Sequence, residues 1–214
     1  MPEQQSVQIR AAGVTLQGDL TLPANARGVV LFAHGSGSSR HSSRNRAVAN
    51  ELQAGALGTL LIDLLTEEEE AVDIRTRHLR FDIEMLADRL VGASDWLAAE
   101  PATANLHIGL FGASTGGSAA LVAAARKPER IAAVVSRGGR PDLAGDALPH
   151  VKAPTLLIVG GDDVQVIELN QVAYDQMQCE RKLEIVPRAS HLFEEPGKLK
   201  IVANLARDWF KRYL

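Results

Sequence analysis

The chain has 214 residues, of which 46% are apolar and 23% charged, values typical of one globular domain. We therefore expect a single domain over residues 1–214. The formal net charge of −3 and the aromatic content of 4% do not favour nucleic acid or an anionic membrane as a partner. The one cysteine, Cys179, excludes an intramolecular disulfide and a thiolate metal cluster, and we expect it to be an ordinary packing residue.

The N-terminal segment MPEQQSVQIRAAG lacks the basic-then-apolar pattern of a signal peptide. No apolar run approaches the length of a transmembrane helix. These two features predict a soluble, cytoplasmic protein without a membrane partner.

The chain begins with a hairpin pattern and continues with short apolar runs. Residues 7–23 alternate apolar and polar side chains around Gly13, which is typical of a β-hairpin. We expect further strands at 29–34, 58–63, 107–112, 131–136, 153–160 and 182–187. Continuous apolar runs of this length indicate strands that are buried on both faces, and such strands are usually parallel.

Amphipathic segments of helical length lie between these runs. We expect helices at 44–53, 81–99, 114–126, 166–178 and 197–213. The acidic run 67–70 favours an exposed loop or the first turn of a helix over a metal site, because no histidine lies at ligand spacing with it. The alternation predicts an α/β fold with an open, mostly parallel sheet and helices on both faces. In such folds ligands bind at the carboxyl ends of the strands.

The segment GLFGASTGGSAALVAAA, residues 109–125, allows two interpretations. Gly112, Ser114 and Gly116 form G-x-S-x-G, the pattern of a catalytic serine at a sharp strand-to-helix turn. The same glycines could instead form a phosphate-binding loop. A dinucleotide site needs its glycines after the first strand and an acid about 20 residues later. Here they follow a middle strand, and the residues near 134 are AAVVS, so the nucleophile interpretation is favoured.

A catalytic serine needs a base and an acid, and later strand ends provide both. Asp162 and Asp163 follow the run 153–160, and His191 follows the run 182–187. The spacing alone leaves both aspartates open as the acid. Ser, Asp and His in this chain order are typical of the α/β-hydrolase triad.

The charge that develops on a substrate carbonyl oxygen needs two backbone N–H donors. We assign these donors to Thr115, directly after the serine, and to Ser36 in the segment HGSG. We expect His34 to shape this oxyanion loop, and surface or structural roles for His41, His78, His107 and His150. The chemistry requires no metal and no organic cofactor.

Three motifs, HGSGSSR, GASTGG and SHLFEEPG, resemble the dienelactone hydrolase-like branch of the α/β-hydrolases. More narrowly, the chain looks like a bacterial subgroup that also occurs joined to a phosphoribosyltransferase domain. The likeness covers nearly the whole chain and implies an eight-stranded hydrolase sheet with little or no cap domain.

The resemblance also bears on the choice of acid and nucleophile. The family's acid motif, G-x-x-D-x-x-V, falls on Gly160, Asp163 and Val166, which favours Asp163 over Asp162. Authentic dienelactone hydrolases use a cysteine nucleophile, whereas this elbow carries Ser114. The resemblance therefore implies a serine esterase more than a dienelactone ring-opening enzyme.

Arginines cluster near the strand ends. Arg137 and Arg140 follow the run 131–136 and are candidates for binding an anionic part of a substrate. The alternative is that the arginines pair with acids in the long loops: 67–70, Asp73, Asp82 and Asp142. We favour the pairing interpretation.

Together these patterns predict a hydrolase that cleaves a small-molecule carboxylic ester or lactone through an acyl-enzyme. Two alternatives remain. One is a non-catalytic or regulatory partner of a phosphoribosyltransferase. The other is a thioesterase, amidase or carbon–carbon bond hydrolase that uses the same triad. The sequence indicates no oligomeric state.

Overall fold

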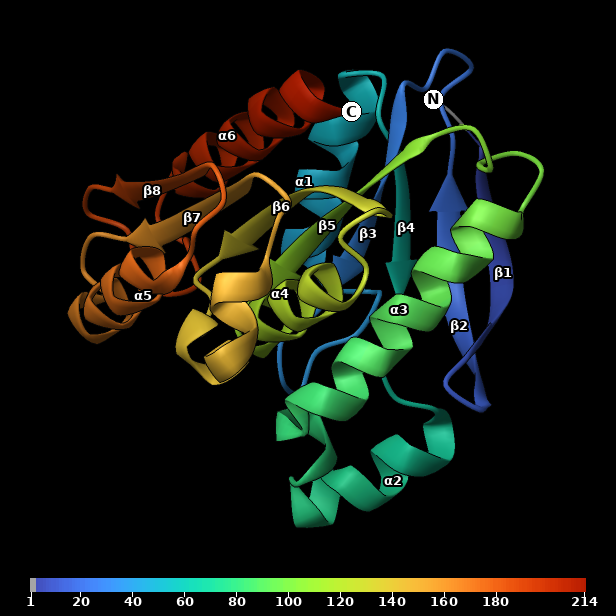
Figure 1. The fold of residues 1–214 in the computed structure, drawn as a ribbon, viewed down its shortest axis with the longest axis horizontal. Coiled ribbons are helices and arrows are strands. Elements are labelled where there is room, and N and C mark those ends of the chain that lie inside the picture. Colours follow the sequence, from blue (N-terminus) through green and yellow to red (C-terminus); the bar gives the residue numbers. More distant parts are fainter. Residues whose placement is uncertain (1–2) are drawn as a thin grey trace.

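The computed structural model describes residues 3–214 and has an eight-stranded sheet at its centre (Figure 1). The strand order is β1-β2-β4-β3-β5-β6-β7-β8. The strands are β1 (Gln4–Ala11), β2 (Val14–Thr21), β3 (Gly28–Ala33), β4 (Gly58–Ile62), β5 (His107–Ala113), β6 (Ile131–Arg137), β7 (Thr155–Gly160) and β8 (Arg181–Val186). β1 and β2 are antiparallel to their neighbours, and all other pairs are parallel. The predicted hairpin and mostly parallel sheet are confirmed.

Within residues 3–214 the chain forms six α-helices, five of which cover the two faces of this sheet. They are α1 (Ser43–Ala54), α2 (Glu67–Thr76), α3 (Ile83–Ala99), α4 (Thr115–Arg126), α5 (Val164–Gln176) and α6 (Lys198–Tyr213). Helices α1 and α6 lie on one face, while α3, α4 and α5 lie on the other (Figure 1). Each face has its own apolar core, as expected for a sheet whose central strands are apolar on both sides.

The central strands are buried because both of their faces are covered. Every residue of β3 and of β7 is buried. On the α1/α6 face, the rings of Phe32 and Phe111 pack with their centroids 4.8 Å apart. The β3–β5 register pairs Leu31 with Leu110, and both of these residues belong to the core on the opposite face. This packing brings the ends of β3 and β5 side by side.

The acidic run 67–70 is the first turn of the ten-residue helix α2, one of the two forms expected from the sequence. Thr66 and Glu69 form a capping box, in which each side chain binds the other residue's backbone N–H. Glu69 also accepts a hydrogen bond from the buried Arg89 of α3, at 2.6 Å. Arg89 in turn donates to the carbonyl of Ala11 at the end of β1. The helix is therefore anchored to α3 and, through Arg89, to the hairpin.

The sequence interpretation missed the 3₁₀ segment Pro141–His150 that follows β6. It contains Pro149 and a left-handed Gly145 with φ of 47°, so it has no uninterrupted helical pattern. No further domain is inserted over the strand ends within residues 3–214, as expected for a fold without a cap. In that same part of the chain, no helix has both the length and the apolarity needed to span a bilayer.

Helix α3 packs against the hairpin at Gly92. A Cβ atom at this position would lie 2.6 Å from the Cβ and 2.7 Å from the Cα of Ala11. The glycine therefore permits the close approach of α3 to β1. We predict that Gly92→Val forces the two elements apart and lowers the free energy of unfolding by about 1–3 kcal/mol.

Urea denaturation measures this loss. Ala99→Val, at an exposed position of the same helix, is the matched control and should cost only a few tenths of a kcal/mol. Equal effects of the two substitutions would contradict the packing role of Gly92.

Candidate active site

Ser114 lies in the sharp turn between β5 and α4. Its φ and ψ are 52° and −122°, a strained conformation for a residue with a side chain. A Cβ on Gly112 would lie 2.4 Å from the carbonyl oxygen of Gly116, and a Cβ on Gly116 would lie 2.3 Å from that of Ala33. The turn therefore needs glycine at both positions and is filled by backbone, which leaves no open cradle for a phosphate.

The segment after β6 holds this turn from the side. The backbone N–H of Ser114 donates to the carbonyl of Arg137 at 3.2 Å, and its carbonyl accepts from the N–H of Arg140 at 3.3 Å. The Ser118 hydroxyl of α4 donates to the Arg140 carbonyl. The buried Asn170 of α5 donates to the carbonyl of Gly139 at 3.0 Å. Helices α4 and α5 thus lock the segment against which the serine turn rests.

His191 and Asp163, the base and the acid that we expected from the sequence, are joined by a hydrogen bond. The His191 Nδ1 atom donates to Asp163 Oδ2 at 2.7 Å. Because the carboxylate only accepts, Nδ1 carries the proton and Nε2 is left as the proton acceptor. Asp162 is exposed, and its backbone N–H donates to Ala189. The geometry thus selects Asp163 as the partner of His191.

Gly138 lies against the imidazole of His191. It has a left-handed φ of 52°, and a Cβ there would lie 3.5 Å from both Nδ1 and Cε1 and 3.1 Å from the His191 carbonyl oxygen. The sequence interpretation did not identify this residue, although the adjacent pair Gly138-Gly139 at a strand end was a signal for a close backbone approach. The glycine leaves room for the ring beside the strand end.

A cavity of about 240 Å³ brings the predicted residues together. The loop before α1 and the start of α1 form one part of its wall, and the ends of β5 and β6 with the His191 segment form the rest. The residues that line it are Gly35, Ser36, Ser38, Ser42, Arg44, Asn45, Ala113, Ser114, Arg137, His191 and Leu192. Within residues 3–214 no hydrogen bond joins the Ser114 and His191 side chains, and catalytic bonds of this kind often tighten only when substrate binds. The cavity places a hydroxyl nucleophile, an imidazole and two guanidinium groups in one space.

The predicted oxyanion donors lie beside the nucleophile. A Cβ on Gly35 would be 3.1 Å from the Ser114 Cβ, so the loop that carries Ser36 contacts the serine turn. Ser36 and Thr115 also line one small pocket. Among the described residues neither backbone N–H has a hydrogen-bond acceptor, so both remain available to a ligand.

His34 attaches the oxyanion loop to the segment after β4. Its Nε2 accepts from the N–H of Leu64 at 3.0 Å, and its Nδ1 donates to the carbonyl of Gly35 at 2.9 Å. Burial lowers the pKa of His34, while the Gly35 hydrogen bond and the charges of Asp63 and Glu70 oppose that shift. The ring is therefore neutral, and both nitrogens are used structurally.

The two candidate substrate arginines have different surroundings. Arg140 forms a two-pronged ion pair with Asp142, at 2.9 and 2.8 Å, and does not line the catalytic cavity. Arg137 is only 6% exposed and lines the cavity, where its Nη2 donates to the Oδ1 atom of Asn45 at 3.3 Å. Burial, and then the charge of Arg44, lower the pKa of Arg137 to about 10, so it remains cationic at neutral pH.

Most of the other loop arginines pair with acids, as the favoured interpretation expected. Arg80 binds the fully buried Asp73, and Arg40 binds Asp63. Arg89, in α3, likewise forms an ion pair with Glu69 of the acidic run 67–70. In residues 3–214 no three His, Cys, Asp or Glu side chains are grouped as metal ligands.

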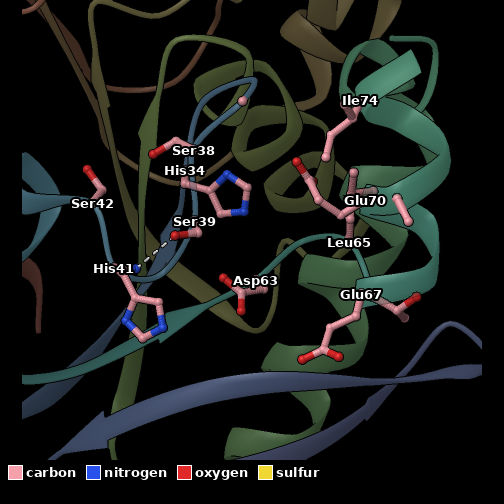
Figure 2. Close-up of a pocket in the computed structure, with 13 residues that line it drawn as sticks. His34, Ser38, Ser39, His41, Ser42, Asp63, Leu65, Glu67, Glu70 and Ile74 are labelled. Carbon is pink, nitrogen blue, oxygen red and sulfur yellow. Dashed lines mark hydrogen bonds between the residues drawn. The ribbon is translucent and has the colours of Figure 1, made fainter. Parts of the chain in front are cut away.

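A second cleft, of about 610 Å³, adjoins the catalytic cavity. Loop residues 34–42 form one wall, and α2 with the segment before it forms the other (Figure 2). The apolar residues of this cleft are Leu65, Ala71 and Ile74, and its acidic residues are Asp63, Glu67 and Glu70. Ser38 and Ser42 line both cavities. The sequence did not reveal this cleft, because its walls come from separate loops that only the fold brings together.

The neutral state of His34 predicts a pH dependence of stability. The unfolded chain takes up a proton near pH 6.5, whereas the folded chain resists it, so stability falls as the pH drops through 6.5. We expect this residue to cost the wild type up to about 1.4 kcal/mol between pH 7.5 and 5.5. His34→Gln should lack this component. Urea denaturation at both pH values tests the difference, and an unchanged pH dependence in the variant would contradict it.

The chain resembles known proteins over its whole length. A model of the dienelactone hydrolase family matches residues 18–214. A solved dienelactone hydrolase from Anabaena variabilis ATCC 29413 is 64% identical, with a TM-score of 0.98 over 100% of this chain and 99% of that chain. Est1E from Butyrivibrio proteoclasticus shares the fold alone, with 16% identity and a TM-score of 0.79 over 97% of this chain and 98% of that chain.

A curated relative extends well beyond the matched region. A putative phosphoribosyl transferase of Mycobacterium tuberculosis (strain CDC 1551 / Oshkosh) is 58% identical over 210 residues. Those residues are 98% of this chain and 46% of that protein, so this chain spans about half the length of the curated relatives it matches. The family match over most of the sequence and the hydrolase sheet around the serine turn agree, and the chain belongs to the dienelactone hydrolase family.

Proposed function

We propose that this chain is a serine hydrolase that cleaves a small-molecule carboxylic ester or lactone through an acyl-enzyme. The observation that carries the proposal is the bond of 2.7 Å between His191 and Asp163, in a site whose other wall presents Ser114 on a strained turn. A hydroxyl at neutral pH is a weak nucleophile, and this arrangement supplies the base and the orienting acid that it needs.

The first half of the reaction forms the acyl-enzyme. His191 Nε2 removes the proton of Ser114, whose oxygen attacks the ester carbonyl carbon. The backbone N–H groups of Ser36 and Thr115 stabilise the negative charge on the carbonyl oxygen. When the carbon–oxygen bond breaks, the imidazolium gives its proton to the leaving alcohol.

The second half releases the acid. His191 takes a proton from a water molecule, and the resulting hydroxide attacks the acyl carbon. The proton then returns to Ser114 as the acyl bond breaks. Throughout, Asp163 holds the Nδ1–H tautomer and stabilises the imidazolium that forms twice in each cycle.

The name of the Mycobacterium tuberculosis relative raises phosphoribosyl transfer as a second candidate function. The matched residues include the serine turn, where backbone atoms already occupy the space beside Gly112 and Gly116. A phosphate cradle formed by these glycines would need open space beside them. We therefore assign hydrolysis to this chain, and a regulatory role beside a transferase becomes an outcome of the following test.

A fluorophosphonate probe tests the nucleophile directly, because it labels only a serine that a neighbouring base activates. We predict stoichiometric labelling of the wild-type chain and none of Ser114→Ala, measured by intact-mass spectrometry. Labelling of Asp163→Asn and Ser114→Ala to the wild-type extent would overturn the serine-hydrolase assignment. Absence of labelling in the folded wild type would favour the regulatory alternative.

The two neighbouring aspartates offer a matched comparison. Asp163→Asn cannot hold the required tautomer and should lower kcat on a simple aryl ester by about 10³- to 10⁴-fold. Asp162→Asn changes an exposed side chain and should leave kcat within about threefold of the wild type. Equal losses in the two variants would contradict the role of Asp163. Matched thioester and amide substrates in the same assay separate the related bond classes.

A further inference from the structure

Arg137 is a buried cation that has no acidic partner within residues 3–214. Its side chain makes one hydrogen bond, to the neutral Asn45, and its buried Nε has no partner within residues 3–214. By contrast, the neighbouring arginines Arg80 and Arg140 each form an ion pair with a carboxylate. An uncompensated buried charge is costly, and one that lines a cavity is a candidate for binding a ligand of opposite charge.

A second guanidinium increases the positive charge of the same cavity. Arg44 lines it, and its charge lowers the pKa of Arg137 further. Arg44 donates through Nη1 to the mostly exposed Glu194 at 3.1 Å, while its buried Nε has no partner among the described residues. Two like charges held together in this way favour an anion between them.

Within residues 3–214 no aspartate or glutamate lines the cavity, and its other polar groups include the hydroxyls of Ser38 and Ser42. Asn45 is itself 3% exposed and orients the Arg137 guanidinium by accepting its hydrogen bond. The result is a preformed anion site in the same cavity as Ser114.

The adjoining cleft has the opposite character. Figure 2 shows Glu67, Glu70 and Asp63 around the same space as Leu65 and Ile74. Like-charge repulsion disfavours an anion there, whereas the apolar side chains suit an uncharged hydrocarbon group. The two cavities therefore differ in the charge of the group that each would accept.

The position of His191 decides which half carries the anion. The histidine must reach the oxygen of the leaving alcohol in order to protonate it. Arg44, Arg137 and His191 line the same cavity. Arg44 binds Glu194, three residues after His191, and Arg137 directly precedes Gly138, where a Cβ atom would lie 3.5 Å from the imidazole. From these attachments we infer that both guanidinium groups face the side of the cavity where the alcohol leaves.

We propose that Arg137 and Arg44 bind an anionic group, a carboxylate or a phosphate, on the leaving alcohol of the ester, while the acyl group is uncharged. This inference rests on the proposed function. The reaction is ester plus water to carboxylic acid plus an anionic alcohol, and the proton that His191 gives to the alcohol is the one that it removed from Ser114.

Four acetate or succinate esters test the proposal. The first pair is 3-acetoxybenzoate and its neutral analogue 3-acetoxybenzamide, and 3-acetoxyphenyl phosphate distinguishes phosphate from carboxylate. Monophenyl succinate places the anion on the acyl side instead. We expect the wild type to prefer the anionic alcohols over the amide in kcat/KM by about 10- to 100-fold, and to disfavour monophenyl succinate.

Variants connect this preference to the arginines. Arg137→Met and Arg44→Met should each lower kcat/KM on the anionic alcohols by much more than on the neutral amide, and so remove most of the preference. Arg137→Lys keeps the charge without the planar fork and should retain part of it. Arg130→Met is the matched control, because this exposed arginine lies at the opposite end of β6, and it should leave the preference unchanged.

Stability provides a second readout. Removal of an unpaired buried charge should leave the thermal midpoint of Arg137→Met equal to or above that of the wild type, so loss of the preference would not reflect unfolding. If this variant does not fold, Arg44→Met and Arg137→Lys carry the test.

The possible outcomes separate the inference from the function on which it rests. Equal losses on anionic and neutral esters, or a preference for monophenyl succinate, would overturn the anion site while fluorophosphonate labelling persists. Absence of labelling would overturn the serine hydrolase itself, and the anion site with it.

Discussion

The site depends on one steric constraint, the strained backbone of Ser114 between β5 and α4. The turn can be this tight only because Gly112 and Gly116 allow backbone from three segments to meet without side chains between them. The carbonyl of Ala33 at the end of β3 lies where a Cβ of Gly116 would be. The parallel register of β3 and β5 is therefore a requirement of the turn at Ser114 as well as a feature of the sheet.

Charge is divided across the oxyanion loop. One side holds the unpaired Arg137 beside Arg44, and the other presents the carboxylates of the α2 cleft. The loop between them is attached through His34, which is uncharged and uses both nitrogens to bind backbone. Because His34 is uncharged, it favours neither an anion nor a cation. The difference in charge between the two cavities therefore comes from the residues that line them.

Much of the fold and site was readable because the relevant signals are local. The apolar runs predicted the strands, and G-x-S-x-G predicted the turn at Ser114, because steric demands act over a few residues. The order of Asp163 and His191 at later strand ends was readable for the same reason, since parallel strands end at one edge. Spacing alone left both Asp162 and Asp163 open as the acid, and the hydrogen bond between His191 and Asp163 selects Asp163.

The unpredicted parts depend on partners that are distant in sequence. Arg44 meets Glu194 across 150 positions, and sequence alone does not say which arginine keeps a carboxylate and which does not. The expected pairing with an acid is confirmed for Arg140, which binds Asp142. Arg137 lines the cavity and has no acidic partner within residues 3–214. The full length of α2 was missed because its stability comes from a cap and from a neighbouring helix more than from an apolar stripe.

The anchoring of α2 has a consequence for how ligands enter and leave. Glu69 caps the start of the helix and also binds Arg89, so the outer wall of the cleft is held by charge-assisted hydrogen bonds at its root. A wall held in this way, with no domain above it in residues 3–214, stays in place while the contents of the cleft change. Turnover would then need no opening or closing step, and departure of the product would be governed by its contacts with the pocket instead of by the motion of a lid.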